Sequence, residues 1–324
     1  MTDAQLFDLD VARSDRRRPR PGTETSAFGV ADRVNHDSTR FYERMPHPSM
    51  ARSQGPPVRV HGPNVVEVGD ARCLNLPDRC AGLVFTSPPY HVGKDYDSDQ
   101  SFEDYLALLQ GAFTEAFRVL EHGGRILVNV AGLGRQPYVP LPGIVARILG
   151  EVGFTLAGEI VWIKSTAPRS MAKGTFFSPQ HPVIEDLSER IVMAVKGDFG
   201  RVPKVNERKT LGLPFAGDMD IDALQRTNWM SWASDLWFVA PVSAKQIGHP
   251  CPFPPELAER AIRMYSFVGD LVVDPFAGSG TTCQVAHEFG RRFYGVDLDP
   301  DYVVLARQRL SSVTPCLFNP EPGQ

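Results

Sequence analysis

Short apolar runs alternate with longer amphipathic stretches over most of the chain, from residue 64 to residue 310. In the stretch 102–120, apolar residues recur every three or four positions, which predicts a helix with one buried face. The run 126–130 is almost wholly apolar and predicts a buried strand. The same patterns predict strands at 65–68, 83–85, 154–163, 190–195, 271–273 and 293–296, and helices at 142–152, 255–266, 279–289 and 300–310.

This alternation predicts the fold class, because strands separated by helices of such length form a mostly parallel sheet with helices on both faces. Two segments depart from it. Residues 1–62 are rich in Arg and poor in apolar positions, so they are expected to form a poorly ordered basic arm, either a solvated tail or a contact for phosphates. Residues 199–245 are polar, rich in Gly and Pro, and hold three of the four tryptophans, with Trp237 expected in the core.

The composition is typical of a globular protein, with 42 % hydrophobic and 22 % charged residues among 324. No apolar run approaches the roughly 20 residues of a membrane helix, and the first 25 residues lack the apolar centre of a secretory signal. The 5 cysteines show no C-x-x-C spacing, which indicates a reducing cytosol and neither a disulfide framework nor a metal site. The net charge of −4 neither supports nor excludes a nucleic-acid partner, because local charge steers a ligand.

A tight glycine turn, D-P-F-A-G-S-G-T-T at 274–282, joins the predicted strand 271–273 to the helix after it. Glycines let the backbone approach a ligand, and the N–H groups at a helix start offer donors. After the next strand comes Asp297, where a carboxylate can accept both hydroxyls of a ribose. The turn lacks the G-x-G-x-x-G of dinucleotide sites and the G-K-[ST] of phosphate loops, which favours S-adenosylmethionine, an adenosine linked to a small zwitterion.

The segment T-S-P-P-Y at 86–90 directly follows the predicted strand 83–85. An exocyclic amino group of a nucleobase is a poor nucleophile, and acceptors aimed at its hydrogens favour its reactive pyramidal form. The Ser87 hydroxyl and the Pro88 carbonyl can supply these acceptors, or Ser87 can donate to the ring nitrogen. The prolines hold that carbonyl in place, and Tyr90 offers a flat face to an extruded base. Alone the segment fits an ordinary turn; beside the glycine turn it predicts a catalytic role.

These two motifs resemble the catalytic and cofactor motifs of the bacterial DNA amino methyltransferases. H-P-C-P-F-P at 249–254, with Glu256, Leu257 and Arg260 behind it, resembles the segment before the family's cofactor helix, and G-D-A at 69–71 resembles its adenine-contacting motif. The catalytic motif comes before the glycine motif, which is the permuted order of the family's β group. The resemblance implies a Rossmann-like S-adenosylmethionine-dependent methyltransferase from about 65 to 310, without a covalent enzyme intermediate.

The resemblance assigns a role to each matched residue. Asp70 is expected to receive the adenine amino group of the cofactor, and Asp297, where the family more often has Glu, is expected to hold its ribose. The cofactor-binding residues are expected to be Asp70, Thr86, His249, Pro250, Asp274, Phe276, Gly278, Gly280, Thr281, Thr282 and Asp297. The catalytic residues that hold the target base are expected to be Ser87, Pro88, Pro89 and Tyr90. The catalytic half is then 63–198, the DNA target-recognition insert 199–245, the cofactor-binding half 246–313 and a tail 314–324.

Ser87 resembles the cytosine-N4 enzymes, since adenine-N6 enzymes usually carry Asp or Asn at this position. The main hypothesis is site-specific methylation of cytosine N4 in double-stranded DNA by base flipping; adenine N6, RNA or a small molecule as substrate, and an inactive DNA-binding module are the alternatives. The expected DNA contacts are Lys164, Arg169, Lys173, Arg201, Lys204, Arg208 and Lys209. The expected context is the bacterial cytoplasm, at the nucleoid, as a monomer or homodimer, with a restriction endonuclease for the same site as a possible companion.

Overall fold

The computed structural model describes residues 64–90, 101–133, 137–165, 175, 178–184, 186–199, 229–242 and 253–313. The strands are β1 (Val65–Val68), β2 (Ala81–Thr86), β3 (Leu120–Val130), β4 (Thr155–Ile163), β5 (Ser188–Val195), β6 (Leu236–Phe238), β7 (Leu271–Asp274) and β8 (Arg292–Asp297). The helices are α3 (Phe102–Val119), α4 (Leu141–Val152), α8 (Pro255–Tyr265), α9 (Thr281–Glu288) and α10 (Pro300–Ser311). Every predicted helix and strand is thus present.

These strands form one 8-stranded sheet in the order β1-β8-β7-β2-β3-β5-β4-β6. Neighbouring strands are parallel, except that β5 is antiparallel to both β3 and β4, which confirms the prediction of a mostly parallel sheet. From β7 the chain continues to β8 on one side, and from β2 it continues to β3 on the other. The strands β7 and β2 therefore flank a topological switch point, where sheets of this kind bind ligands at their carboxyl ends.

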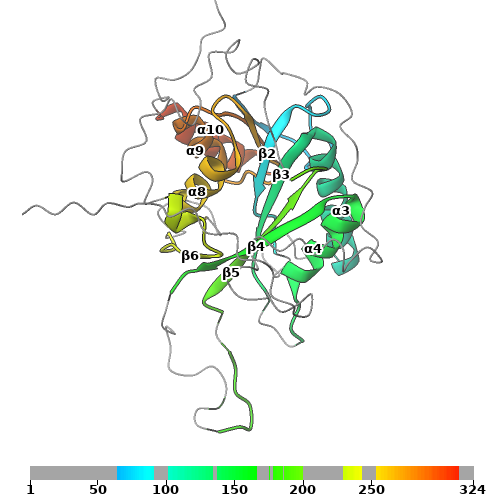
Figure 1. Cartoon of the computed structure of the whole chain (residues 1–324), viewed down its shortest axis with the longest axis vertical. Coiled ribbons are helices and arrows are strands. Elements are labelled where there is room, and N and C mark those ends of the chain that lie inside the picture. Colours follow the sequence, from blue (N-terminus) through cyan, green and yellow to red (C-terminus); the bar gives the residue numbers. More distant parts are fainter. Residues whose placement is uncertain are drawn as a thin grey trace, which may run out of the picture. The chain divides into compact units, whose positions relative to one another are not determined.

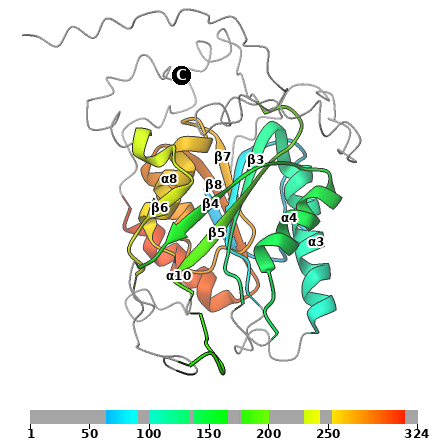
Figure 2. The same cartoon turned by 60° about the horizontal axis from the view of Figure 1, so that its bottom comes forward.

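Helices cover both faces of this sheet, as predicted (Figure 1). Figure 2 shows α3 and α4 on one side, and α8 and α10 on the other. Because the side chains of a strand alternate between its faces, Val84 packs into the core under α3 and α4, with Phe113. Leu83 and Phe85 pack into the opposite core with Leu257 of α8. The strand β2 is therefore buried along its whole length, which is typical of a central parallel strand.

Two strands differ from the sequence prediction. β3 begins at Leu120, whereas the sequence predicted a start at 126. Leu120 directly follows α3 and already pairs with Ala81 of β2, and the two glycines after it, which predicted a break, do not end the strand. β6 was not predicted, because a strand of 3 residues is too short to show a period.

The strand β6 belongs to the segment 199–245 that the sequence assigns to a recognition insert. It pairs in parallel with β4 at an edge of the sheet. Trp237 is fully buried, as predicted, and its indole N–H donates to the carbonyl of Trp232 at 2.8 Å. The sheet therefore includes part of this segment. Most of the rest of it, 200–228 and 243–245, lies outside the described residues, as do the arm 1–62 and the tail 314–324.

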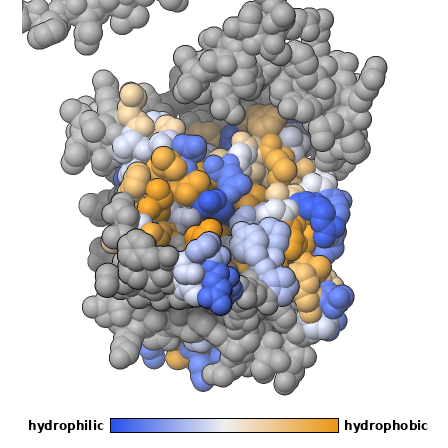
Figure 3. Space-filling model, turned by 90° about the horizontal axis from the view of Figure 1, so that it is seen from below, coloured by the Kyte–Doolittle hydropathy of each residue, from blue (hydrophilic) through white to orange (hydrophobic). Residues whose placement is uncertain are grey.

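In the described ranges, no helix is long and apolar enough to cross a membrane. On the face seen in Figure 3, hydrophilic residues lie between groups of hydrophobic ones.

Candidate active site

The carboxyl ends of neighbouring strands bring most of the predicted site residues to one edge of the sheet. Thr86 ends β2, Asp274 ends β7 and Asp297 ends β8. In the pairing of β1 with β8, Val68 lies opposite Asp297, so that Asp70 follows at the same edge. The T-S-P-P-Y motif and the glycine turn, far apart in the sequence, therefore meet at the switch point between β7 and β2.

A hydrogen bond joins the two motifs directly. The Thr86 hydroxyl donates to Asp274 Oδ1 at 2.7 Å, and the backbone N–H of Phe276 donates to the same oxygen at 3.1 Å. The side chain of Thr282, in the first turn of α9, also hydrogen-bonds Asp274. Thr86, Asp274 and Thr282 are all buried. These contacts fix the end of β2, where the T-S-P-P-Y motif begins, against the end of β7, where the glycine turn begins.

Burial raises the pKa of Asp274 to about 6, although the hydrogen bonds from Thr86 and Thr282 act in the opposite direction. Desolvation is the larger effect because this carboxyl group is only 1 % exposed. A buried carboxylate at a ligand-binding edge therefore costs stability in the ligand-free protein, and a cationic ligand group would offset that cost.

This shift predicts how the stability of the ligand-free protein depends on pH. Between about pH 4, the usual pKa of Asp, and about pH 6, the folded state binds more protons than the unfolded state, so stability falls as pH rises through this window. The expected loss is about 3 kcal/mol, and the variant Asp274→Asn should not show it. Urea unfolding of both proteins across this range measures the difference; parallel profiles would contradict the raised pKa.

The glycine turn needs its glycines for both conformation and contact. Gly278 and Gly280 have φ of 49° and 77°, in the left-handed region that disfavours other residues. A Cβ on Gly280 would lie 2.8 Å from the Cβ of Ala306 in α10. From the same helix, Arg309 donates to the carbonyl and the hydroxyl of Ser279 at 2.6 and 2.9 Å. The turn is therefore braced by α10, through an arginine that the sequence does not single out.

Asp297 lies against this turn. Its Oδ2 accepts the backbone N–H of Gly278 at 2.8 Å, and its Oδ1 accepts that of Asp299 at 3.0 Å. Burial raises the pKa of Asp297, against the effect of these hydrogen bonds. The residue is still partly exposed, and each carboxylate oxygen can accept a further hydrogen bond. Asp297 is thus suited to accept the two hydroxyls of a ribose beside the glycine turn.

Asp70 lies next to Asp297, since the backbone N–H of Gly69 donates to the Asp297 carbonyl at 3.0 Å. The Asp70 carboxylate accepts the Arg72 guanidinium in a forked contact, with Nη2 to Oδ2 at 2.7 Å. This side-chain hydrogen bond lowers the pKa of Asp70. The group is therefore an ionised acceptor at the edge of the site, suited to accept a hydrogen bond from an adenine amino group, and its charge is paired with that of Arg72.

The T-S-P-P-Y motif leaves β2 and lies against the end of β3. The Ser87 hydroxyl donates to the backbone carbonyl of Asn129 at 3.1 Å and is 3.1 Å from the Tyr90 hydroxyl. Tyr90 donates to Glu189 Oε2 at 2.8 Å, and the Asn129 amide donates to the same oxygen at 2.6 Å. Pro88 is buried and Pro89 is partly exposed. The sequence did not identify Asn129 or Glu189; a polar residue at the end of the apolar run 126–130 was the available signal for Asn129.

Lys164, one of the expected DNA contacts, lies beside this cluster. Its ammonium group is 2.6 Å from Glu189 Oε1 and lies over the ring of Trp162, 5.5 Å from its centroid. Its charge is therefore paired within the site, and a contact of Lys164 with DNA stays a prediction. The other expected DNA contacts, Arg169, Lys173, Arg201, Lys204, Arg208 and Lys209, lie outside the described residues, as do His249 and Pro250.

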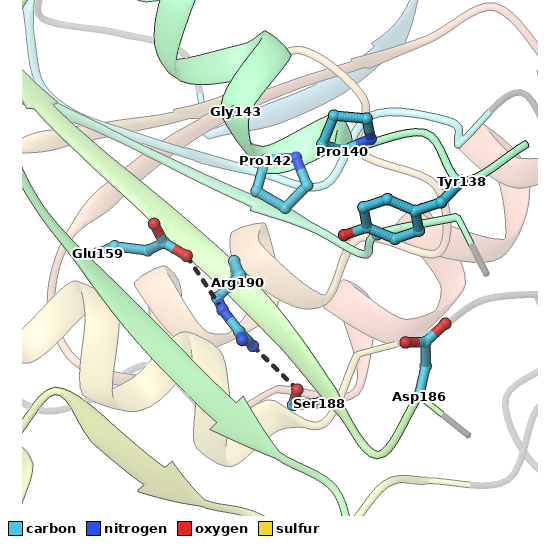
Figure 4. A pocket seen from close by; sticks show the side chains of 9 residues that line it. Tyr138, Pro140, Pro142, Gly143, Glu159, Asp186, Ser188 and Arg190 are labelled. Atoms are coloured by element: carbon cyan, nitrogen blue, oxygen red, sulfur yellow. Dashed lines mark hydrogen bonds and ion pairs between the residues drawn. The ribbon is translucent and has the colours of Figure 1, made fainter. Parts of the chain in front are cut away.

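A separate cavity of about 270 Å³ opens on the other face of the sheet, under the start of α4 (Figure 4). It is lined by Tyr138, Pro140 and Pro142, and by the ion pair of Glu159 with Arg190 at 3.0 Å. Arg190 follows Glu189 in β5, so the two side chains point to opposite faces. None of the predicted site residues lines this cavity.

A glycine turn and the strand-end carboxylate of Asp297 meet a T-S-P-P-Y motif at the switch point of a doubly wound sheet, which defines a Rossmann-like methyltransferase. The family model for DNA methylases of the N6/N4 type matches residues 81–308, and the chain belongs to this family, which uses S-adenosylmethionine.

Individual DNA methyltransferases are also similar to this chain in sequence and in structure. The chain is 29 % identical over 244 residues to the type II methyltransferase M.BglII of Bacillus subtilis, a match that spans 74 % of this chain and 66 % of that protein. It is 33 % identical to TTHA0409 of Thermus thermophilus, whose crystal structure holds S-adenosylmethionine, with a TM-score of 0.59 over 76 % of this chain and 93 % of the other. The PvuII cytosine-N4-specific DNA methyltransferase, at 21 % identity, shares the fold, with a TM-score of 0.56 over 77 % of this chain and 87 % of its own.

Proposed function

We propose that this chain is a type II DNA methyltransferase that transfers a methyl group from S-adenosylmethionine to the N4 amino group of cytosine in duplex DNA. The observation that carries the proposal is the hydrogen bond of Thr86 to Asp274, 2.7 Å long, which joins the end of the catalytic strand to the cofactor turn. A base held by the T-S-P-P-Y motif thereby lies next to the methyl donor. Ser87, where adenine enzymes usually carry Asp or Asn, favours cytosine.

The cofactor, when bound, supplies an electrophilic methyl group on a sulfonium. The chain's residues suit the rest of such a cofactor: Asp297 can accept its ribose hydroxyls, Asp70 its adenine amino group, and the buried carboxylate of Asp274 matches its positive charge. The backbone N–H of Gly280 is not available to it, because it donates to the Ala277 carbonyl at 2.8 Å. The turn therefore lets the cofactor approach the backbone closely, but not all of its backbone N–H groups are free to donate to the cofactor.

At the base, the chain's residues orient the amino group and accept its hydrogens. Ser87 gives its own proton to the Asn129 carbonyl, so its oxygen lone pairs can accept a hydrogen from the target amino group. The carbonyl of buried Pro88 is the second acceptor. The ring of Tyr90, partly exposed and held by its hydroxyl, provides the stacking surface for the flipped base. The target nitrogen would take the methyl group directly as the carbon–sulfur bond breaks, leaving the cofactor as a neutral thioether, and would then release one proton to water.

Base-resolved mapping of modified bases in DNA from cells that express the chain tests this proposal. We expect N4-methylcytosine in one short sequence motif, and a much lower fraction of modified sites in cells that express Ser87→Ala. Methylated adenine would overturn the choice of base and leave the methyltransferase in place. A soluble, cofactor-binding protein that leaves DNA unmodified would overturn the proposal itself.

Methylation of that motif also suggests a restriction-modification role. DNA recovered from expressing cells should resist a nuclease that cleaves at the same motif, as expected if the chain protects DNA from a companion endonuclease.

A further inference from the structure

Glu189 is a buried carboxylate that the mechanism above does not use. It lies near the start of β5 with only 8 % of its surface exposed. Charged groups are rarely buried unless they are paired, since removing a charge from water costs free energy. The groups that contact the Glu189 carboxylate therefore indicate why a charged residue is buried at this position.

Those contacts divide between the two carboxylate oxygens. Oε1 pairs with the Lys164 ammonium at 2.6 Å. Oε2 accepts two donors from the catalytic side, the Tyr90 hydroxyl at 2.8 Å and the Asn129 amide at 2.6 Å. Lys164 thus neutralises the carboxylate and fixes its position, and the other oxygen faces the T-S-P-P-Y motif.

The contact with Glu189 sets the orientation of the Asn129 side chain. Only the NH₂ end of an amide can face a carboxylate at this distance, so the carbonyl end, Oδ1, must point away from Glu189. Asn129 is 1 % exposed, and its Oδ1 accepts no hydrogen bond from the described part of the chain. A buried acceptor without a donor is costly, and the hydrogens of an exocyclic amino group are donors that a substrate would bring to this site.

The contact with Glu189 also sets the direction of the hydroxyl groups. Because Tyr90 gives its single proton to Glu189 and Ser87 gives its own to the Asn129 carbonyl, the Tyr90 oxygen accepts from the Asn129 amide, at 3.1 Å. A fixed Tyr90 hydroxyl leaves its ring in one orientation. Glu189 therefore fixes the orientation of Tyr90 and Asn129, the residues of this cluster that are expected to meet the base.

We propose that Glu189 is a positioning residue for methyl transfer: held by Lys164, it orients the Tyr90 hydroxyl and the Asn129 amide. Asn129 Oδ1 and the Ser87 oxygen then share one hydrogen of the target amino group in a three-centre hydrogen bond, and the Pro88 carbonyl accepts the other hydrogen. This role rests on the proposed function, since the amino group is that of the flipped cytosine. It assigns catalytic contact to Asn129 and positioning to Glu189.

The variant Glu189→Gln tests this role, because it keeps the size of the side chain. One glutamine oxygen cannot accept from both Lys164 and the Tyr90–Asn129 pair, so the ordering contact is lost. We expect the single-turnover rate of DNA methylation to fall about 10- to 100-fold, with the affinity for S-adenosylmethionine within about 3-fold of wild type. Glu159→Gln, which alters an ion-paired glutamate on the next strand, is the matched control and should keep the wild-type rate.

Two further readouts separate positioning from general support of the fold. Wild type should bind DNA with cytosine at the target position more tightly than DNA with 2-pyrimidinone, which lacks the amino group, and Glu189→Gln should lose this preference. In an Asn129→Ala background, Glu189→Gln should cause less than about 3-fold further loss of rate, because the two residues act together.

If Glu189→Gln keeps the rate and the preference for cytosine, or if its full effect persists in Asn129→Ala, the positioning role is wrong and the proposed function stands. If wild type itself transfers no methyl group to DNA, the proposed function fails and this inference fails with it.

Discussion

Replacing Ser87 by alanine should lower the rate of methyl transfer by about 10² to 10³-fold, as removal of one preorganised polar group at a reacting centre does in other enzymes. The affinity for S-adenosylmethionine should stay within about 3-fold of wild type. The affinity is expected to stay because Ser87 hydrogen-bonds the Asn129 carbonyl and Tyr90. The hydrogen bond to the glycine turn comes from the neighbouring Thr86. Single-turnover kinetics and calorimetry measure the two quantities separately.

Ser188→Ala is the matched control for that substitution. Ser188 begins β5 next to the catalytic cluster, and its hydroxyl accepts only from Arg190, at 2.9 Å, among the hydrogen bonds described for it. Its loss should leave the rate of methyl transfer within about 2-fold, as for most substitutions outside a reacting centre. A Ser87→Ala enzyme as fast as Ser188→Ala would show that the hydroxyl group of the motif has no part in the reaction.

Replacing Asp297 by alanine should have the reverse effect, a loss of about 10²-fold in affinity for S-adenosylmethionine with little change in rate at saturating cofactor. Two hydrogen bonds from ribose hydroxyls to a carboxylate are lost, each worth about 1.5 kcal/mol. The Gly278 N–H also loses its acceptor, which loosens the turn. Calorimetric titration gives the affinity, and turnover at high cofactor concentration gives the rate.

Asp299→Ala controls for the loss of a carboxylate at the same strand end. Asp299 caps α10 by accepting the Asp301 N–H at 2.8 Å, so its loss should cost about 1 kcal/mol of stability and leave cofactor affinity within about 3-fold. Equal losses of affinity in the two variants would mean that Asp297 acts only through the fold of the loop and does not hold the ribose.

The fold and the cofactor side of the site were predictable because their signals are local. Thr86, Asp274 and Asp297 each follow a short apolar run, and the carboxyl ends of parallel strands share one edge of a sheet. The glycine turn carries its own signal in the spacing of Gly278 and Gly280. These predictions needed only the order of strands and helices along the chain.

The residues that the sequence did not identify depend on long-range pairing. Glu189 meets Asn129 because β5 runs antiparallel to β3, with Asn129 opposite Ile191. No local period indicates that pairing, and a glutamate at the start of a strand is usually solvent-exposed. Arg309 is similar: in α10 it resembles a surface arginine, and its role appears only where the helix packs against the turn. The charge of Lys164 made it a candidate in the sequence. Its pairing with Glu189 was not predictable, because that contact also depends on how the strands pair.

The hydrogen bond between Thr86 and Asp274 spans 188 residues of the chain. During synthesis at about 5 to 20 residues per second, β2 therefore waits roughly 10 to 40 s for its neighbour β7 to leave the ribosome. Throughout that interval the nascent chain carries a mostly apolar strand, fully buried in the finished fold, with an unpaired edge, which is a template for aggregation. Because this motif order completes the active site so late, we expect the yield of folded protein to rise with chaperones that shield β2 and with slow, cool expression.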